Sequence, residues 1–269
     1  MKKKASTILL MLILLIGLSL LLYPTLSELW NSFHQSQSIA GYVEKMASID
    51  NEQYEEILQA AKDYNARFKR ESLWYLQEDE VPIYQEQLNV GGDGVMGYIE
   101  IPKIKCSLPI YHGTSESVLQ VAVGHIEGSS LPVGGESTHC VLSGHRGLPS
   151  AKLFTNLDQL VTGDLFVLYV LDEVFTFEVD QIRIVEPDDV SELAIEEGEE
   201  LCTLVTCTPY GINSHRLLVR GHRVDNIYVS SVRVAADAVQ VDETLVALAI
   251  GIPMLLVFLI WVMIRYRKR

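Results

Sequence analysis

Hydrophobic residues gather into two long runs, one near each end of the chain. Residues 5–23 are apolar apart from Ser6, Thr7 and Ser19, and residues 245–264 contain no charged residue. Each run has about 20 residues, enough for a helix to cross roughly 30 Å of hydrocarbon. Three lysines precede the first run, and a basic cluster follows the second. The positive-inside rule therefore predicts that both termini are cytoplasmic and that residues 30–240 lie outside the cell membrane.

Each run also has other interpretations. The first run resembles a signal peptide, but no Ala-x-Ala-like cleavage site follows Tyr23, which favours an uncleaved anchor. The alternative interpretation of the second run is a buried core helix, although a helix in the core of a soluble protein rarely runs so long without a charged residue. A lipid anchor with a removed tail requires small residues and a polar spacer upstream, and the basic cluster argues against it. We therefore expect a transmembrane helix at each end of the chain.

Between the two runs, the spacing of apolar residues changes from helical to alternating. Apolar residues recur at helical spacing from Tyr54 to Phe68, and Asp50 with Gln53 resembles a capping box, so we expect an amphipathic helix there. The pattern breaks up over residues 74–94 around a proline and three glycines, which predicts a mobile connection.

Short alternating segments dominate the rest of the region outside the membrane. They are residues 97–104, 107–111, 139–143, 164–170, 175–185, 201–207 and 215–224. Short strands separated by turn residues favour a closed β-barrel over a sandwich. Short helices are expected to interrupt the strands at residues 116–121 and 152–160.

The formal charge of −14 understates how acidic the middle of the chain is. Seven of the 21 basic residues lie in the two terminal clusters, which leaves 14 against all 35 acidic residues. This charge repels anionic polymers and excludes a nucleic-acid binder, whereas it favours cationic groups such as amines on a partner. A solvated acidic surface is the simpler interpretation of the charge alone.

The four cysteines, Cys106, Cys140, Cys202 and Cys207, lack the spacing of a zinc site. We therefore expect neither a metal nor another cofactor. By period-two alternation Cys202 faces away from Cys207, so it is expected in the core, and Cys106 and Cys140 are interpreted in the same way. An even number of cysteines outside the membrane leaves a disulfide possible.

The segment from Thr203 to Gly221 carries the strongest chemical signal. Cys207 lies at the end of one predicted strand, and Arg216 follows nine residues later on the next strand, so the two are expected side by side. A thiolate beside a guanidinium supplies a nucleophile and a cation for the oxyanion that forms when the sulfur attacks a carbonyl.

A cysteine nucleophile also needs a proton donor for its leaving group, and histidine serves because its pKa lies near neutrality. Of the seven histidines, His145 stands out because it follows a strand-like run that begins at Cys140 and is flanked by a glycine. His125 ranks second.

Four sequence blocks occur in a characteristic order. They are Gly97–Pro102, Gly124–Gly135, Ser143–Pro149 and Thr203–Gly221, the last containing Thr-Cys-Thr-Pro-Tyr-Gly followed by His-Arg-Leu-Leu-Val-Arg. Over roughly residues 97–223 the chain resembles a sortase of Gram-positive bacteria, specifically the pilin-polymerising class C. The last block is highly specific, whereas a lone Thr-x-x-Cys would be weak.

This resemblance implies a closed eight-stranded β-barrel and a C-terminal membrane anchor. It also implies that Cys207 is the nucleophile, Arg216 the essential arginine and His145 the catalytic histidine. The implied reaction cleaves a Leu-Pro-x-Thr-Gly-like sorting signal of a secreted pilin between Thr and Gly through a thioester. The acyl group then passes to a pilin lysine amine, which assembles pili.

In one respect the sequence departs from class C. Such enzymes commonly carry a lid before the barrel, with an Asp-Pro-aromatic motif that plugs the cleft, and no such triplet occurs upstream of Gly97. Either the lid is missing, or another residue replaces the motif, with Trp74, Tyr75 and Tyr84 as the aromatic candidates. Packing of the helical segment on the barrel is the other interpretation of these three residues.

Five residues are predicted to bind substrate. Thr206 and Thr208 flank the thiol, Tyr210 and Asn213 lie in the connection between the two strands, and His125 lies in Gly-His-Ile-Glu-Gly. Loop geometry explains part of this pattern equally well, and His125 also has a purely structural interpretation.

Other functions share these features. A wall-anchoring sortase would use the same three residues with a cell-wall peptide amine. A cysteine protease would prefer water as the acceptor, and a membrane-tethered binding module would not need the thiol at all.

The predicted organisation has six parts. They are an N-terminal anchor or signal segment at 1–29, a helical segment with a possible lid at 30–96, a catalytic barrel at 97–230, a linker at 231–244, a transmembrane helix at 245–264 and a cytoplasmic tail at 265–269.

Overall fold

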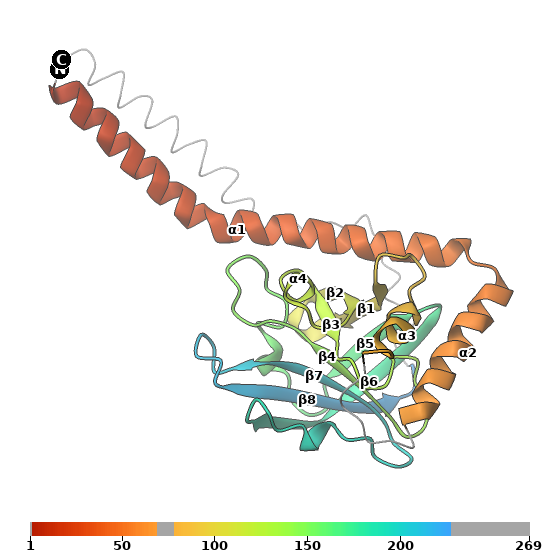
Figure 1. The fold of residues 1–269 in the computed structure, drawn as a ribbon. Coiled ribbons are helices and arrows are strands. Elements are labelled where there is room, and N and C mark those ends of the chain that lie inside the picture. Colours follow the sequence, from red (N-terminus) through yellow and green to blue (C-terminus); the bar gives the residue numbers. More distant parts are fainter. Residues whose placement is uncertain (1, 69–77, 227–269) are drawn as a thin grey trace. The chain divides into compact units, whose positions relative to one another are not determined.

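The protein is described here by a computed structural model that covers residues 2–68 and 78–226. Eight strands form a closed barrel, and three helices precede it (Figure 1). The strands are β1 (Val95–Ile101), β2 (Cys106–His112), β3 (Val123–His125), β4 (Thr138–Ser143), β5 (Leu165–Val170), β6 (Glu173–Val185), β7 (Glu200–Thr208) and β8 (His215–Val224). The predicted closed barrel is thus confirmed, whereas the predicted C-terminal helix lies outside the described residues.

The strand order around the barrel is β1-β2-β3-β4-β7-β8-β6-β5, and β5 closes the barrel by pairing with β1. The pairs β2–β3 and β4–β7 are parallel, and the other neighbouring pairs are antiparallel. The parallel pair β4–β7 brings together two segments about 60 residues apart in the sequence.

Two features of the barrel differ from the sequence prediction. β3 was not predicted, because three residues are too few to show an alternating pattern. The helix predicted at residues 152–160 is instead a series of turns with one short 3-10 helix, η2 (Leu157–Gln159). The other predicted short helix is present as α4 (Glu116–Leu119), and further 3-10 turns occur as η1 (Pro102–Ile104) and η3 (Ser191–Leu193).

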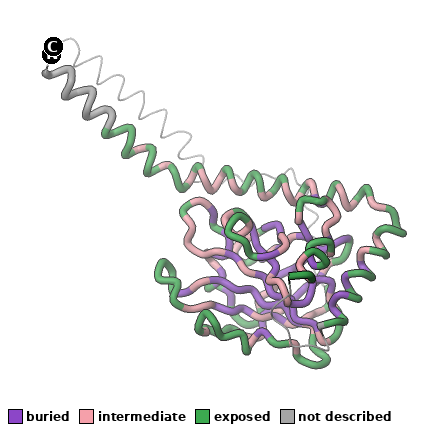
Figure 2. Tube along the Cα trace, in the orientation of Figure 1, coloured by how far each residue is buried: buried purple, intermediate pink, exposed green. Residues whose placement is uncertain are grey.

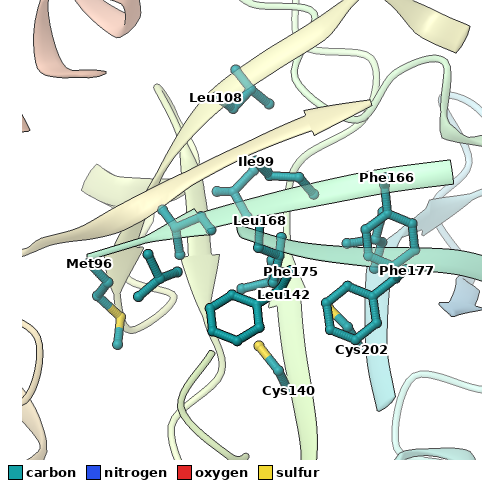
Figure 3. Close-up of a cluster of buried hydrophobic side chains, with 14 of the residues drawn as sticks. Met96, Ile99, Leu108, Cys140, Leu142, Phe166, Leu168, Phe175, Phe177 and Cys202 are labelled. Carbon is teal, nitrogen blue, oxygen red and sulfur yellow. The ribbon is translucent and has the colours of Figure 1, made fainter. Parts of the chain in front are cut away.

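Side chains that alternate inward along the strands fill the barrel. Figure 3 shows this core, in which Leu142 and Cys140 of β4 meet Phe166 of β5, Phe177 of β6 and Cys202 of β7. All five are less than 5 % exposed. Burial of such side chains contributes on the order of 1.5–3 kcal/mol each, which makes the barrel a rigid support for residues at its surface. Figure 2 shows the same concentration of buried residues in the strands.

Helix α1 (Lys2–Ser48) runs without a break from the N-terminal apolar run to the barrel. One face of this helix contacts the barrel domain through the side chains of Asn31, Gln35, Tyr42 and Lys45. These residues share a face because they are spaced by whole helical turns. The buried Tyr42 hydroxyl donates to the carbonyl of Met96 at 3.1 Å. One segment of α1 is long and apolar enough to cross a membrane. The boundary predicted at residues 29 and 30 therefore falls inside one continuous helix.

Helix α2 (Asn51–Phe68) begins as the sequence predicts. The backbone N–H of Gln53 donates to the carboxylate of Asp50 at 2.9 Å, which is the expected N-terminal cap. Ala61 and Tyr64 are buried in the same cluster as the barrel core. The amphipathic face of α2 therefore packs against the barrel.

The segment after α2 is more ordered than predicted. Part of the expected mobile connection is helix α3 (Val81–Glu86), in which Pro82 occupies the first turn. Proline is tolerated there because its missing N–H would have no helical partner in any case. Tyr84 is fully buried, which fixes α3 on the barrel. Trp74 and Tyr75 lie outside the described residues.

Candidate active site

Cys207 and Arg216 are direct neighbours across the antiparallel pair β7–β8. Residues directly opposite each other in such a pair have Cβ atoms about 4.5–5.5 Å apart and point to the same face. The short connection from Pro209 to Ser214 forces this pairing, as the sequence predicts. Cys207 is only partly buried, so its sulfur can be approached from outside the barrel.

The parallel pairing of β4 with β7 places His145 at the same position along the strand direction as Cys207. Ser143 is opposite Val205, and the backbone N–H of Gly144 donates to the carbonyl of Val205 at 3.0 Å, so the register continues past the end of β4. His145 lies two residues beyond Ser143, as Cys207 lies two residues beyond Val205. The His145 side chain is 28 % exposed. The three candidate catalytic residues therefore come from neighbouring strands at one end of the barrel.

The side chains of Cys207 and Arg216 project from the outer face of the barrel. On β7 the side chains of Cys202 and Leu204 belong to the core, whereas Val205 belongs to a second apolar cluster. That cluster consists of Val141, Leu193, Val205 and Leu218, with Ile126 and Val185 packed against it. Cys207 has the same parity as Val205, and Arg216 the same parity as Leu218. The thiol is therefore on the side of the small apolar cluster, away from the core.

Arg216 retains unused hydrogen-bond donors. Its Nη1 donates to the backbone carbonyls of Asn213 at 3.4 Å and His215 at 3.2 Å. Across residues 2–68 and 78–226 no carboxylate forms an ion pair with it, and no hydrogen bond joins it to the thiol or to His145. Its charge is therefore available to an oxygen that develops negative charge beside Cys207.

Arg146 is a site residue that the sequence reasoning missed. Its side chain is 9 % exposed and forms an ion pair with Asp158, and its Nη1 lies 3.5 Å from the hydroxyl of Thr208. Its guanidinium carbon lies 5.8 Å from the centre of the Tyr210 ring. Arg146 thus links the segment that carries His145 to the end of the strand that carries the thiol. Its only signal in the sequence was its place directly after His145.

The two threonines beside the thiol do not face the same way as the thiol. Thr206 is 2 % exposed and donates its hydroxyl to the carbonyl of Gly144 at 2.7 Å, so the prediction that it contacts substrate is wrong in this structure. Thr208 is also buried and interacts with Arg146. Alternation along β7 turns both side chains inward, and both stabilise the connection between β7 and the His145 segment.

Tyr210 and Asn213 lie where the sequence predicts, in the β7–β8 connection. Tyr210 is 60 % exposed, and Asn213 is exposed with a left-handed backbone at φ 59°. Asparagine tolerates this conformation well. Both side chains are accessible to a substrate that approaches Cys207.

His125 has a structural role instead of lining a substrate site. It is fully buried, its Nδ1 lies 2.9 Å from the Tyr84 hydroxyl, and its Nε2 lies 2.9 Å from the carbonyl of Ser130. The Tyr84 hydroxyl also accepts the backbone N–H of Gly113 at 3.0 Å. Tyr84 is therefore a buried anchor for α3 and not a plug above the thiol.

The other three cysteines are unsuited to attack a peptide. Burial raises the pKa of Cys106 to about 12 and that of Cys202 well above its usual value. Burial acts in the same direction on Cys140, but hydrogen bonds from Cys202 and His125 outweigh it and lower the pKa of that thiol. Cys140 and Cys202 nevertheless lie inside the barrel, where a peptide has no access (Figure 3). All four cysteines are free thiols.

Comparisons with known proteins agree with this geometry. Residues 99–224 match the sortase domain family. Sortase D of Bacillus subtilis strain 168 is 36% identical over 131 residues, which cover 48% of this chain and 63% of that protein. The alignment therefore spans somewhat less than two thirds of this curated relative.

Solved structures provide longer matches. Sortase C1 from Streptococcus agalactiae is 53% identical, with 71% of this chain and 99% of that chain covered and a TM-score of 0.69. Sortase C from Streptococcus pneumoniae is 45% identical, with 70% and 97% covered and a TM-score of 0.62. With a closed barrel that presents a cysteine, a histidine and an arginine at one end, the chain belongs to the sortase family of cysteine transpeptidases.

Proposed function

We propose that this protein is a class C sortase that cleaves a Leu-Pro-x-Thr-Gly-like sorting signal and joins the threonine to a pilin lysine. The observation that carries the proposal is the direct pairing of Cys207 with an arginine that no carboxylate neutralises within the described residues. Such a pair is suited to acyl transfer, because the thiolate attacks while the cation stabilises the oxyanion.

In the first half of the reaction Cys207 attacks the threonine carbonyl as a thiolate. Arg216 donates hydrogen bonds to the oxygen as it becomes negative, and His145 as imidazolium gives its proton to the departing glycine amine. The carbon–nitrogen bond breaks, and a thioester to Cys207 remains. A donor of this kind contributes on the order of 3 kcal/mol to transition-state stabilisation.

In the second half an amine displaces the thiol from the thioester. Neutral His145 accepts a proton from the amine, the carbon–sulfur bond breaks, and Cys207 leaves as a thiolate. The imidazolium–thiolate pair is then restored for another cycle. Tyr210 and Asn213 are the exposed residues beside Cys207 that we assign to substrate binding.

Two observations favour a pilin lysine as the acceptor. The neighbours with the longest matches reported above are class C enzymes, and the structure of the Streptococcus pneumoniae enzyme was described in terms of pilin substrate specificity. The acidic region between the membrane runs also favours a cationic acceptor. A wall-anchoring sortase with the same three residues remains the second candidate.

The protein acts at the cell surface in this proposal. Helix α1 joins a segment long enough to cross the membrane directly to the barrel, so the enzyme is held close to the outer face of the membrane. Its substrates are then secreted proteins that carry a sorting signal. In this proposal both termini lie in the cytoplasm, as expected from the positive-inside rule.

Product analysis tests the proposal. The enzyme is incubated with a sorting-signal peptide and equal concentrations of a pilin-derived lysine peptide and a cell-wall stem peptide. We expect an isopeptide product with the lysine peptide. Transfer mainly to the stem peptide would indicate the wall-anchoring function, and release of free acid despite abundant amine would indicate a protease.

A further inference from the structure

A carboxylate lies beside the imidazole of His145 on the side that faces α4. Oε2 of Glu116 is 3.9 Å from Nε2 of His145. The side chain of Glu116 is 74 % exposed, so a ligand in solution can reach the space between these two groups.

The Glu116 carboxylate has a defined orientation. Its other oxygen, Oε1, accepts a hydrogen bond from the Gln120 side chain at 2.5 Å, one helical turn further along the chain. This contact leaves Oε2 directed at His145. In the part of the chain that the structure describes, no lysine or arginine pairs with Glu116, so its charge is not neutralised within the protein.

The gap between the two groups is the right size for one ammonium group. At 3.9 Å the carboxylate oxygen and the imidazole nitrogen are too far apart for a direct hydrogen bond. A nitrogen that makes charge-assisted hydrogen bonds of about 2.8 Å to both atoms would form an angle of about 90° between them. Two of the three N–H bonds of a primary ammonium can satisfy that geometry with little distortion.

We propose that Glu116 binds the ammonium group of the acceptor and holds it against neutral His145. This inference rests on the proposed function, since it names the residue that recognises the second substrate of that reaction. A lysine side chain has a pKa of about 10.4 and therefore arrives as an ammonium that cannot attack a thioester. Glu116 binds it in that form, and His145 removes a proton to release the nucleophile.

The proton and electron balance of this step is complete. One ammonium proton moves to His145, and the lone pair of the resulting amine attacks the thioester carbonyl. The carbon–sulfur bond breaks with its electron pair on Cys207, and the second proton of the nitrogen leaves to solvent as the amide forms. The products are the amide, the Cys207 thiolate and the His145 imidazolium.

The role assigned to Glu116 separates the two halves of the reaction. Thioester formation involves no acceptor amine, so it does not need Glu116. Capture of the thioester by a lysine does need it. A nucleophile that is neutral at neutral pH, such as hydroxylamine, has no ammonium group to bind and gains nothing from the carboxylate.

The test uses the Glu116→Gln and Glu116→Asp variants with Glu186→Gln as the matched control. Glu186 is 73 % exposed and lies 3.3 Å from the ring of His215, so its replacement removes the same charge from a similar glutamate–histidine pair. Three quantities are measured: the rate of thioester formation with a sorting-signal peptide, the KM for a lysine peptide, and the rate of capture by hydroxylamine.

We expect Glu116→Gln to raise the KM for the lysine peptide about fivefold, the effect of losing one exposed ion pair. Thioester formation and capture by hydroxylamine should stay within twofold of wild type, and Glu116→Asp should recover part of the loss. Glu186→Gln should leave all three quantities unchanged.

Three results would overturn the inference while leaving the proposed function intact. They are an unchanged KM for lysine in Glu116→Gln, an equal loss in Glu186→Gln, or a fall in thioester formation as large as the fall in transfer. Wild-type enzyme that forms no amide with any primary amine would instead contradict the proposed function itself and this inference with it.

Discussion

Replacing Arg146 with methionine should reduce activity much more than stability. Methionine keeps most of the side-chain length but removes the ion pair with Asp158 and the contacts with Thr208 and Tyr210. Asp158 is 47 % exposed and can be solvated by water, so the lost pair costs at most about 1 kcal/mol. The cation–π contact with Tyr210 contributes about 0.5–1 kcal/mol more.

One term acts in the opposite direction. Among the residues that the structure describes, nothing forms a hydrogen bond with the buried Nε of Arg146, and its removal relieves a desolvation penalty of about 1–3 kcal/mol. The losses and this gain largely offset each other, so the free energy of unfolding should change by no more than about 2 kcal/mol in either direction. Activity should fall further, because a displacement of about 1 Å between His145 and Cys207 can reduce the rate about 100-fold.

The assay compares the rate of thioester formation with the midpoint of thermal unfolding. Arg220→Met is the matched control, since Arg220 is also mostly buried and pairs with Asp180 and Glu196 away from the site. We expect it to lower stability with little effect on the rate. A rate for Arg146→Met within threefold of wild type would refute the proposed link between the His145 segment and the β7 strand.

Three further predictions follow from named contacts. Arg216→Ala should lower kcat by about 10²–10³ while the barrel stays folded, and a comparable loss of secondary structure in circular dichroism would contradict this. Tyr84→Phe removes the hydroxyl that forms hydrogen bonds with the His125 ring and the buried backbone N–H of Gly113, so chemical denaturation should show that the free energy of unfolding falls by about 1–3 kcal/mol. An unchanged free energy of unfolding would contradict the anchoring role of Tyr84. Burial lowers the pKa of His139 in the folded protein below its unfolded value of about 6.5, so the stability it contributes is present above that pH and is lost as the pH falls towards the folded pKa. The melting temperature should therefore fall as the pH is lowered from about 7 to about 5, and it should fall less steeply in His139→Gln. An identical dependence of the melting temperature on pH in both proteins would contradict this.

The sequence predicts the Cys207–Arg216 pair well because the pairing is local. Two alternating segments that are joined by only six residues form neighbouring antiparallel strands, because so short a connection keeps them adjacent. The same local reasoning predicts the cap of α2 at Asp50. Both features depend on residues within ten positions of each other.

Features that depend on distant contacts could not be predicted in this way. The position of His145 beside Cys207 requires the parallel pairing of β4 with β7, which joins segments about 60 residues apart. The role of Arg146 requires Asp158 and Tyr210 to converge on it from two other connections. The strand-like run before His145 and the resemblance to sortases both indicated that histidine, but no pattern within the chain indicated the partners of Arg146.

Two errors had a signal that was available in the sequence. Period-two alternation, which separated Cys202 from Cys207, also turns Thr206 and Thr208 away from the thiol. Pro82 was interpreted as a break although it suits the first turn of a helix, so α3 was missed. Tyr84 then appeared to be a candidate plug, whereas its hydroxyl is fully used within the barrel.

The identity of the acylated residue tests the central claim most directly. The enzyme is incubated with a sorting-signal peptide in the absence of an amine, quenched with acid, digested and analysed by mass spectrometry. The account predicts a threonine thioester on Cys207 that disappears in Cys207→Ala and is released as an amide when a lysine peptide is added. An adduct on Cys106, Cys140 or Cys202, or peptide cleavage that persists in Cys207→Ala, would contradict it.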